Sequence, residues 1–384
     1  MDRCYGIEAC TLMDAIRSSL ALATPWPTRV ILNNSLPYPT RTFSLFSFLT
    51  AKPSFMNPPV VPPMDASSSI SWSLGLPLIP PFLNDKESDN VVALGPGVNY
   101  AVVAATALDT SFHEARGTVD PVANISLGVE LAWFKRSLAS ICSSASDCRN
   151  LIGRSLILMG EIGGTDYNGP IFDYKPIEEV ESYVPLVIDT IISAVNLIDM
   201  GAQTLVVPGT FPIGCSSSIL TVRASKNKKD YDNRTGCLIR YNELVEYHND
   251  LLIKKLNHLR ELHPNVIIIY ADYYNAAMQI IYYPIKFGFT NPVLKSCCGG
   301  GGPYNYNINL SAQCGHVLAT VCDDPDAYAY WDGIHFTEDA YRIIFKSLFN
   351  GQYTTPRFNS LCPTPTPTST SQAEVALSGL QIQR

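Results

Sequence analysis

The sequence predicts an α/β fold in which helices cover both faces of a parallel sheet. Short apolar runs without polar positions alternate with longer segments whose apolar residues recur every three or four positions. Strands of this kind are typical of a sheet that is buried on both faces. The chain has 384 residues, of which 46% are hydrophobic, so it can bury one large core or two modest ones.

Each element follows from its local pattern. SLILMGE is a short apolar run that ends near a double glycine, and VPLVIDTIISAVNLIDMG has helical spacing with a terminal glycine stop. The predicted strands are residues 155–161, 204–209 and 265–274, and the predicted helices between them are residues 184–201 and 238–262. Parallel sheets place their chemistry at the carboxyl ends of the strands. The segments GEIGGTDYN, PGTFPIGC and ADYYNAA lie at these ends.

Three regions of the chain differ in composition. Residues 1–73 are rich in Ser, Pro and Thr and have no sustained periodicity, and the prolines of PSFMNPPVVPP exclude a helix there. Residues 74–360 have the alternation of strands and helices that indicates one α/β domain. Residues 361–384 include the low-complexity run CPTPTPTSTSQ, which has little to bury, so we expect this tail to be disordered.

Charge and hydropathy exclude several classes of partner. The net charge is −7 and no basic stripe with interleaved aromatic residues occurs, so we expect no nucleic-acid partner. No run of 18 or more apolar residues appears, so we expect no transmembrane segment. The first 30 residues carry scattered charges and lack a clean apolar stretch with a cleavage site. We therefore expect no signal peptide in the chain as written.

The cysteines and glycosylation sequons indicate an oxidising compartment. Eleven cysteines occur in closely spaced groups, and none forms the paired CxxC pattern of a zinc site, so we expect no metal. N-glycosylation sequons begin at Asn124, Asn233 and Asn309. The four glycines at 299–302 are not followed by GK[ST], and a flexible loop is a better interpretation than a phosphate-binding loop.

The stretch YWDGIHFTEDAYR places Asp332 and His335 three residues apart, just ahead of a predicted helix. A nucleophilic hydrolase needs an imidazole base and a carboxylate that holds its tautomer. Both groups would come from one loop here. The alternative is a surface aspartate and a hydrogen-bonded histidine at the start of a helix, for which Thr337 is a plausible N-cap.

Several blocks of the sequence resemble those of a known family. LGLPLIPPFL, GVNYAVVAATALD, GEIGGTDYN, GAQTLVVPGTFPIGC, KSCCGGGGPYNYN and WDGIHFTEDAYR are similar, in order, to blocks of the plant GDSL-type esterase/lipases, which are SGNH hydrolases. The matching blocks cover roughly residues 74–351. The resemblance implies a three-layer α/β/α flavodoxin-like sandwich with about five parallel strands. It also implies a secreted monomer that hydrolyses carboxylic esters through a serine acyl-enzyme, without metal or other cofactor.

The same resemblance implies roles for individual residues. His335 would be the general base and Asp332 its orienting partner. Ala104 and Thr165 would line the oxyanion hole, at positions where the family has a glycine and an asparagine. An alanine at this position adds a methyl group that would crowd the acyl oxygen, or it needs a backbone conformation that only glycine favours. The side chain of threonine is shorter than that of asparagine, so its hydroxyl reaches less far towards the oxyanion. Losing one oxyanion donor costs about 100- to 1000-fold in rate.

The block FGDSL, which holds the family's nucleophilic serine, does not occur in this chain. The nearest matches are RSSLA around Ser19 and ILNNSL around Ser35, and neither has the Gly-Asp of the nucleophile turn. The sequence therefore does not identify the nucleophile. Small-molecule, lipid and polysaccharide esters are all open as substrates. Two functions remain: an ester hydrolase, and a non-catalytic remnant or binding protein that keeps the acyl or glycan cleft.

A frameshift would explain the unusual first region. When residues 49–71 are back-translated and read one nucleotide out of frame, the codons permit PYGETFFHEPTGRSPDGRLIIDF, a segment that the family has before LGLPLIPPFL. Met56-Asn57 and Met64-Asp65 force a Glu and a Gly in that reading. We therefore hypothesise that residues 1–73 are largely an out-of-frame translation, and we expect the first strand of the sheet to be missing or disrupted.

Overall fold

A computed structural model of the chain describes residues 45–47, 82, 97–118 and 125–358. Its centre is a six-stranded sheet with the order β2-β1-β3-β4-β5-β8. The strands are β1 (Leu45–Ser47), β2 (Gly97–Asn99), β3 (Leu156–Leu158), β4 (Thr204–Pro208), β5 (Ile267–Ala271) and β8 (Thr354–Thr355). The first five are parallel, and β8 adds an antiparallel edge beside β5. The predicted parallel α/β sheet is confirmed.

The first strand, which we expected to be missing or disrupted, is present as three residues. β1 pairs in parallel with β2 on one side and β3 on the other, with Leu45 opposite Gly97 and Leu156. The run SLFSF around it is rich in aromatic and apolar residues, which favour an extended strand. Its position between two parallel strands also covers the pairing edges that an absent strand would expose. The remaining residues of 1–73 and the tail from 359 onwards lie outside the described residues.

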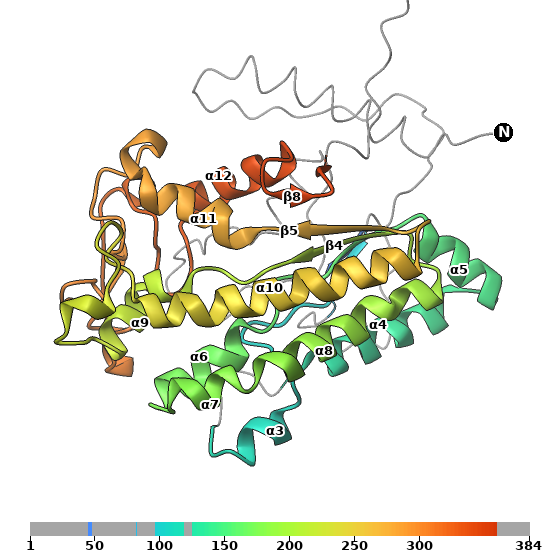
Figure 1. Cartoon of the computed structure of the whole chain (residues 1–384), viewed down its shortest axis with the longest axis horizontal. Helices are drawn as coiled ribbons and strands as arrows, with labels where there is room; N and C mark the ends of the chain where they lie inside the picture. Colours follow the sequence, from blue (N-terminus) through green and yellow to red (C-terminus); the bar gives the residue numbers. More distant parts are fainter. Residues whose placement is uncertain (1–44, 48–81, 83–96, 119–124, 359–384) are drawn as a thin grey trace, which may run out of the picture.

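Helices form a layer on each face of the sheet (Figure 1). One layer contains α4 (Leu127–Ile141), α8 (Val184–Val195) and α10 (Ile239–Leu262), and the other contains α11 (Tyr273–Tyr282) and α12 (Glu338–Phe349). Successive residues of each strand supply the two cores in turn. Leu205 and Val207 of β4 join the first core, whereas Val206 joins the second.

The ends of these helices follow from their capping residues. Asp272 accepts a hydrogen bond from the amide of Asn275 at 3.0 Å and begins α11 directly after β5. Thr337 caps α12 in the same way through the amide of Ala340, and Glu338 and Asp339 fill its first turn. The N-cap role expected for Thr337 is confirmed.

Shorter elements surround the carboxyl ends of the strands. They are α3 (Thr110–Glu114), α6 (Gly164–Phe172), α7 (Ile177–Glu181), α9 (Ser217–Val222) and the strand pair β6 (Cys298–Gly299) and β7 (Thr320–Val321). The helix α5 (Ala145–Gly153) directly precedes β3 and lies at the opposite, amino end of the strands (Figure 1). Among the described residues, four disulfides link Cys142 to Cys148, Cys215 to Cys237, Cys297 to Cys322 and Cys298 to Cys314. The Cys298–Cys314 disulfide connects β6 to the loop that follows it, and the Cys297–Cys322 disulfide connects the residue before β6 to the residue after β7.

One helical stretch, Ile177–Met200, is long and apolar enough to cross a membrane by length and composition. It includes α7, α8 and the 3₁₀ turn that follows them. Val184, Val187, Ile188 and Ile191 of this stretch are at most 1% exposed and belong to the core that α8 shares with α4 and α10. Packing against these helices accounts for its apolar composition.

Candidate active site

The structure brings Asp332 and His335 together in the loop before α12. His335 Nδ1 lies 2.7 Å from Asp332 Oδ2. Asp332 Oδ1 accepts the backbone N–H groups of Ile334 at 3.0 Å and His335 at 2.8 Å. Because an ionised carboxylate can only accept hydrogen bonds, Nδ1 is the ring nitrogen that carries the proton. Nε2 then keeps a lone pair that can take a proton. This is the geometry that a general base and its orienting carboxylate require.

Charge interactions within the pair favour its ionised form. The charge of Asp332 raises the pKa of His335 above its usual 6.5, against the opposing effect of burial. Burial acts to raise the pKa of Asp332, but the charge and the hydrogen bonds of His335 outweigh it and leave this pKa below 3.8. Asp332 therefore stays ionised at neutral pH and stabilises the imidazolium that forms when His335 accepts a proton.

The loop that holds this pair is fixed by backbone contacts. Trp331 N–H donates to the carbonyl of His335 at 2.8 Å, and Ser218 N–H donates to the carbonyl of Gly333 at 3.0 Å. Gly333 has φ +101°, and a Cβ there would lie 2.4 Å from the ring of Tyr306. Only glycine fits this turn, because both the backbone angle and the neighbouring ring exclude a side chain.

Ala104 occupies a backbone conformation that favours glycine. It follows β2 and has φ +61°, in the left-handed region. This conformation costs a residue with a Cβ roughly 1–2 kcal/mol. The turn around it is closed by a 3.1 Å hydrogen bond from Ala105 N–H to the carbonyl of Val102. Among the described residues, none accepts the Ala104 N–H.

Thr165 lies in the first turn of α6, directly after β3. The turn depends on Gly163, whose φ of +109° makes it the left-handed N-cap of the helix. Thr165 is half-buried and follows Gly164, the first helical residue. The amides in this turn point towards the N-terminal end of the helix, where they and the macrodipole favour negative charge. An oxyanion site can thus use the backbone of α6 as well as the Thr165 hydroxyl.

A second acidic residue near the site, Glu161, was not identified from the sequence. It lies between β3 and α6, and a Cβ on Gly164 would meet its carboxylate at 2.8 Å. Burial raises the pKa of Glu161 to about 7, with the charge of His335 opposing this rise and that of Asp166 adding to it. Glu161 in turn raises the pKa of His335. The loop after β3 therefore interacts electrostatically with the Asp332–His335 pair.

Two buried carboxyl groups hold the segment around Ala104. Glu130 of α4 is 1% exposed and accepts the Val102 N–H at 3.0 Å. Burial raises the pKa of Glu130 to about 8, partly offset by this hydrogen bond. Asp166 of α6 is fully buried and accepts the N–H groups of Ala107 and Leu108. Neither residue could be identified from the sequence, since an acid on a helix usually faces solvent.

The structure also places the other candidate residues. Asn233 and Asn309 are exposed, as a glycan acceptor must be, whereas Asn124 lies outside the described residues. Ser19 and Ser35 lie outside them as well. Within the part of the chain that is described, no hydroxyl hydrogen-bonds to His335 Nε2, and no cluster of three or more His, Cys, Asp or Glu side chains could hold a metal ion.

Most of the chain is similar in sequence to known proteins. Residues 66–348 match the family model described as GDSL-like Lipase/Acylhydrolase. The GDSL esterase/lipases At1g28600 and At1g28580 of Arabidopsis thaliana are each 50% identical over 294 residues, which are 76% of this chain and 73% and 74% of theirs. Sinapine esterase of Brassica napus is 44% identical over 295 residues, 76% of this chain and 74% of its own. Because the family model matches more than half of the chain and these relatives are 44% to 50% identical to it, the chain belongs to the GDSL lipase/acylhydrolase family.

Proposed function

We propose that this protein hydrolyses carboxylic esters by a serine-type mechanism in which His335 is the general base and Asp332 orients it. The observation that supports this most is the 2.7 Å contact between His335 Nδ1 and Asp332 Oδ2, in a member of an esterase family. It leaves Nε2 available at the carboxyl ends of the strands, where the chemistry of parallel sheets takes place.

The proposed reaction has two steps. His335 Nε2 takes the proton of a serine hydroxyl while its oxygen attacks the ester carbonyl, and the resulting oxyanion accepts N–H groups from Ala104 and the first turn of α6. The imidazolium then gives its proton to the departing alkoxide, which leaves an acyl-serine. In the second step His335 activates water, which releases the acid and restores the serine.

The serine is expected to come from the chain near the end of β1. The family resemblance implies that the nucleophile follows the first strand, and β1 ends at Ser47 between β2 and β3. Since no GDSL block follows it, the residue that acts there has to be found by experiment. The strained Ala104 and the threonine at 165 are expected to make turnover slower than in relatives with glycine and asparagine.

We also propose that the protein is secreted and glycosylated. Four disulfides and the exposed sequons at Asn233 and Asn309 support an oxidising compartment. Small-molecule esters are the proposed substrates. A panel should include sinapine, since one relative is named sinapine esterase, together with p-nitrophenyl acetate and an acetylated polysaccharide.

The second candidate function is non-catalytic binding of an acyl or glycan ligand. It is favoured by the absent GDSL block, together with the left-handed alanine at position 104. Ester hydrolysis by the purified, disulfide-bonded chain separates the two. Under the first proposal, turnover is measurable and falls to background in His335→Ala but not in His258→Ala, which alters an exposed histidine on α10. Absence of turnover on the whole panel would favour binding.

A further inference from the structure

Asp166 is a fully buried carboxylate with three hydrogen-bond donors. Its Oδ2 accepts Ala107 N–H at 2.7 Å, and its Oδ1 accepts Leu108 N–H at 3.0 Å and lies 3.0 Å from His113 Nε2. Asp166 belongs to α6, whereas the three donors belong to the segment that runs from the Ala104 turn into α3. One side chain therefore joins two segments that are more than 50 residues apart.

His113 completes this arrangement from α3. Its ring is 4% exposed and packs edge-on against Phe112 and Tyr183, with ring centroids 5.3 and 6.4 Å away. Both carboxyl oxygens of Asp166 already accept backbone N–H groups, so His113 Nε2 donates to Oδ1 and is the protonated nitrogen. Nδ1 is buried and has no partner among the described residues. Among the residues that the structure describes, the ring is thus held by its packing and by a single polar contact, the one to Asp166.

The two joined segments contain both oxyanion candidates. Thr165 immediately precedes Asp166 in the first turn of α6, and Ala104 lies three residues before Ala107. The segment between Ala104 and Ala107 is also fixed on its other side, because Thr106 forms a parallel β-bridge with Ser126. A left-handed alanine persists only where the surrounding structure holds it in place.

We propose that Asp166 and His113 act as a clamp that sets the position of the Ala104 N–H relative to the first turn of α6. Both are positioning residues: neither contacts the reacting atoms, and each acts on the backbone that does. The catalytic consequence rests on the proposed ester hydrolase function, whereas the structural consequence does not. Oxyanion donors stabilise a transition state only when they are held in place before the reaction.

Two measurements on the full chain test the clamp. The first is amide hydrogen exchange of peptides that cover residues 101–110, which needs no turnover. The second is the rate of inactivation by a fluorophosphonate, separated into a binding constant and a maximal rate. The variants are Asp166→Asn, His113→Leu and His113→Gln, the last of which keeps a side-chain N–H at similar reach.

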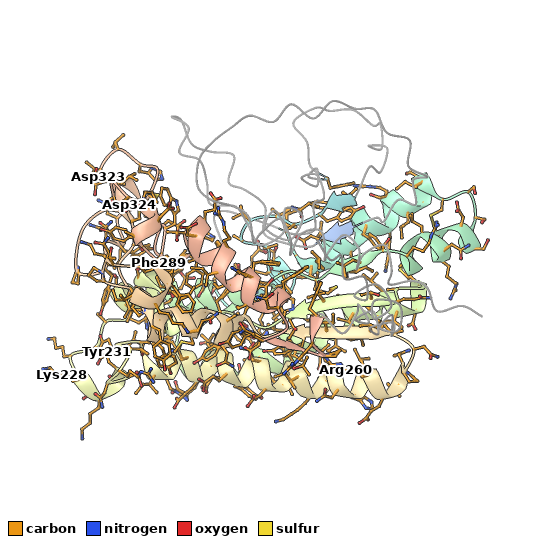
Figure 2. The ribbon with its side chains drawn as sticks, turned by 90° about the horizontal axis from the view of Figure 1, so that it is seen from above. Lys228, Tyr231, Arg260, Phe289, Asp323 and Asp324 are labelled. Atoms are coloured by element: carbon orange, nitrogen blue, oxygen red, sulfur yellow. A yellow bond between two sulfur atoms is a disulfide. The ribbon has the colours of Figure 1, made fainter. Side chains whose placement is uncertain are left out.

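The matched control is Arg260→Met. Arg260 donates to the carbonyls of Ile268 at 2.9 Å and Thr355 at 2.8 Å, so its loss also removes tertiary hydrogen bonds. It lies near the end of α10, on the opposite side of the molecule from Phe289, Asp323 and Asp324 (Figure 2). A general loss of stability would appear in this control, whereas a local loss of the clamp would not.

We expect Asp166→Asn and His113→Leu to speed exchange in residues 101–110 and to lower the maximal inactivation rate about 10- to 100-fold, with an unchanged binding constant. In His113→Gln, the slow exchange of residues 101–110 and the maximal inactivation rate are both expected to be close to those of the unmodified chain. Unchanged exchange in the two disruptive variants, or equal acceleration in Arg260→Met, would overturn the clamp. If the unmodified chain is not labelled at all, the proposed hydrolase function fails, and the exchange data alone decide on the clamp.

Discussion

His335 and Asp332 are hydrogen-bonded to each other within one short loop: the imidazole Nδ1 lies 2.7 Å from Oδ2, and the other carboxylate oxygen accepts the His335 backbone N–H. Asp332 therefore orients the ring of His335, and the backbone N–H of His335 in turn holds the carboxylate of Asp332 in place. This arrangement depends on the turn at Gly333 and on the start of α12.

Asp332→Asn tests the orienting role. An asparagine preserves the shape of the side chain but no longer favours the Nδ1–H tautomer or stabilises the imidazolium, so we expect turnover to fall about 10,000-fold. Initial rates on p-nitrophenyl acetate measure this. Asp326→Asn, in the preceding 3₁₀ turn, is the control and should stay near the unmodified rate. A loss of less than tenfold in Asp332→Asn would contradict an orienting role.

The pH dependence of the reaction follows from the raised pKa of His335. His335 must be unprotonated to accept a proton from the serine. Activity therefore falls as the pH drops through the pKa of His335, which lies above 6.5. Glu161→Gln removes a charge that raises the pKa of His335, so the acid limb of the kcat/KM profile should move to lower pH. Glu178→Gln, an exposed acid on α7, should leave the limb in place. An unmoved limb in Glu161→Gln would show that Glu161 does not act on His335.

Ala104→Gly should stabilise the protein by about 1 kcal/mol. Glycine removes the cost of the left-handed backbone angle, partly offset by the greater freedom of its unfolded chain. Urea unfolding followed by circular dichroism gives the free energy of unfolding. Ala105→Gly is the neighbouring control: among the described residues, Ala105 is not one of those with positive φ. It should destabilise the protein, and a gain of similar size in both variants would refute the assignment.

Glu130 makes stability fall as the pH rises. Its folded pKa of about 8 is above its ordinary 4.5, so the folded state binds more protons than the unfolded state between these values. Glu130→Gln keeps a carbonyl that accepts the Val102 N–H but cannot ionise. We expect its melting temperature to exceed that of the unmodified chain at pH 8, with a smaller difference at pH 5. A difference that is constant with pH would mean that Glu130 does not titrate in this range.

Periodicity in the sequence was sufficient to predict the elements with continuous apolar patterns. The run at 204–209 is β4 (Thr204–Pro208), and the long amphipathic pattern at 238–262 is α10 (Ile239–Leu262). The predicted strand at 155–161 is shorter, Leu156–Leu158, because the chain turns into the glycine loop before α6. The first strand was expected to be missing or disrupted. The composition of the run around β1 favours an extended strand, but three residues do not indicate by themselves that they pair with β2 and β3.

The sequence was less informative about the supports of the site. Asp332 and His335 are close in the chain, so their spacing alone suggested a shared role. Glu130 and Asp166 act on backbone groups that are 28 and 58 or 59 residues away, and no local pattern records such a contact. The sequence gives no indication of the contact of His113 for the same reason. Its only described polar side-chain contact is made after α3 and α6 have packed.

Covalent labelling by a fluorophosphonate, with the modified peptide identified by mass spectrometry, tests the central claim most directly. The proposed mechanism predicts one labelled serine per chain, in the region preceding β2, and no labelling in His335→Ala. The frame hypothesis can be checked alongside by sequencing the 5′ half of the transcript. A folded chain in which no serine is labelled, or in which labelling persists without His335, would contradict a serine hydrolase that uses His335 as its base.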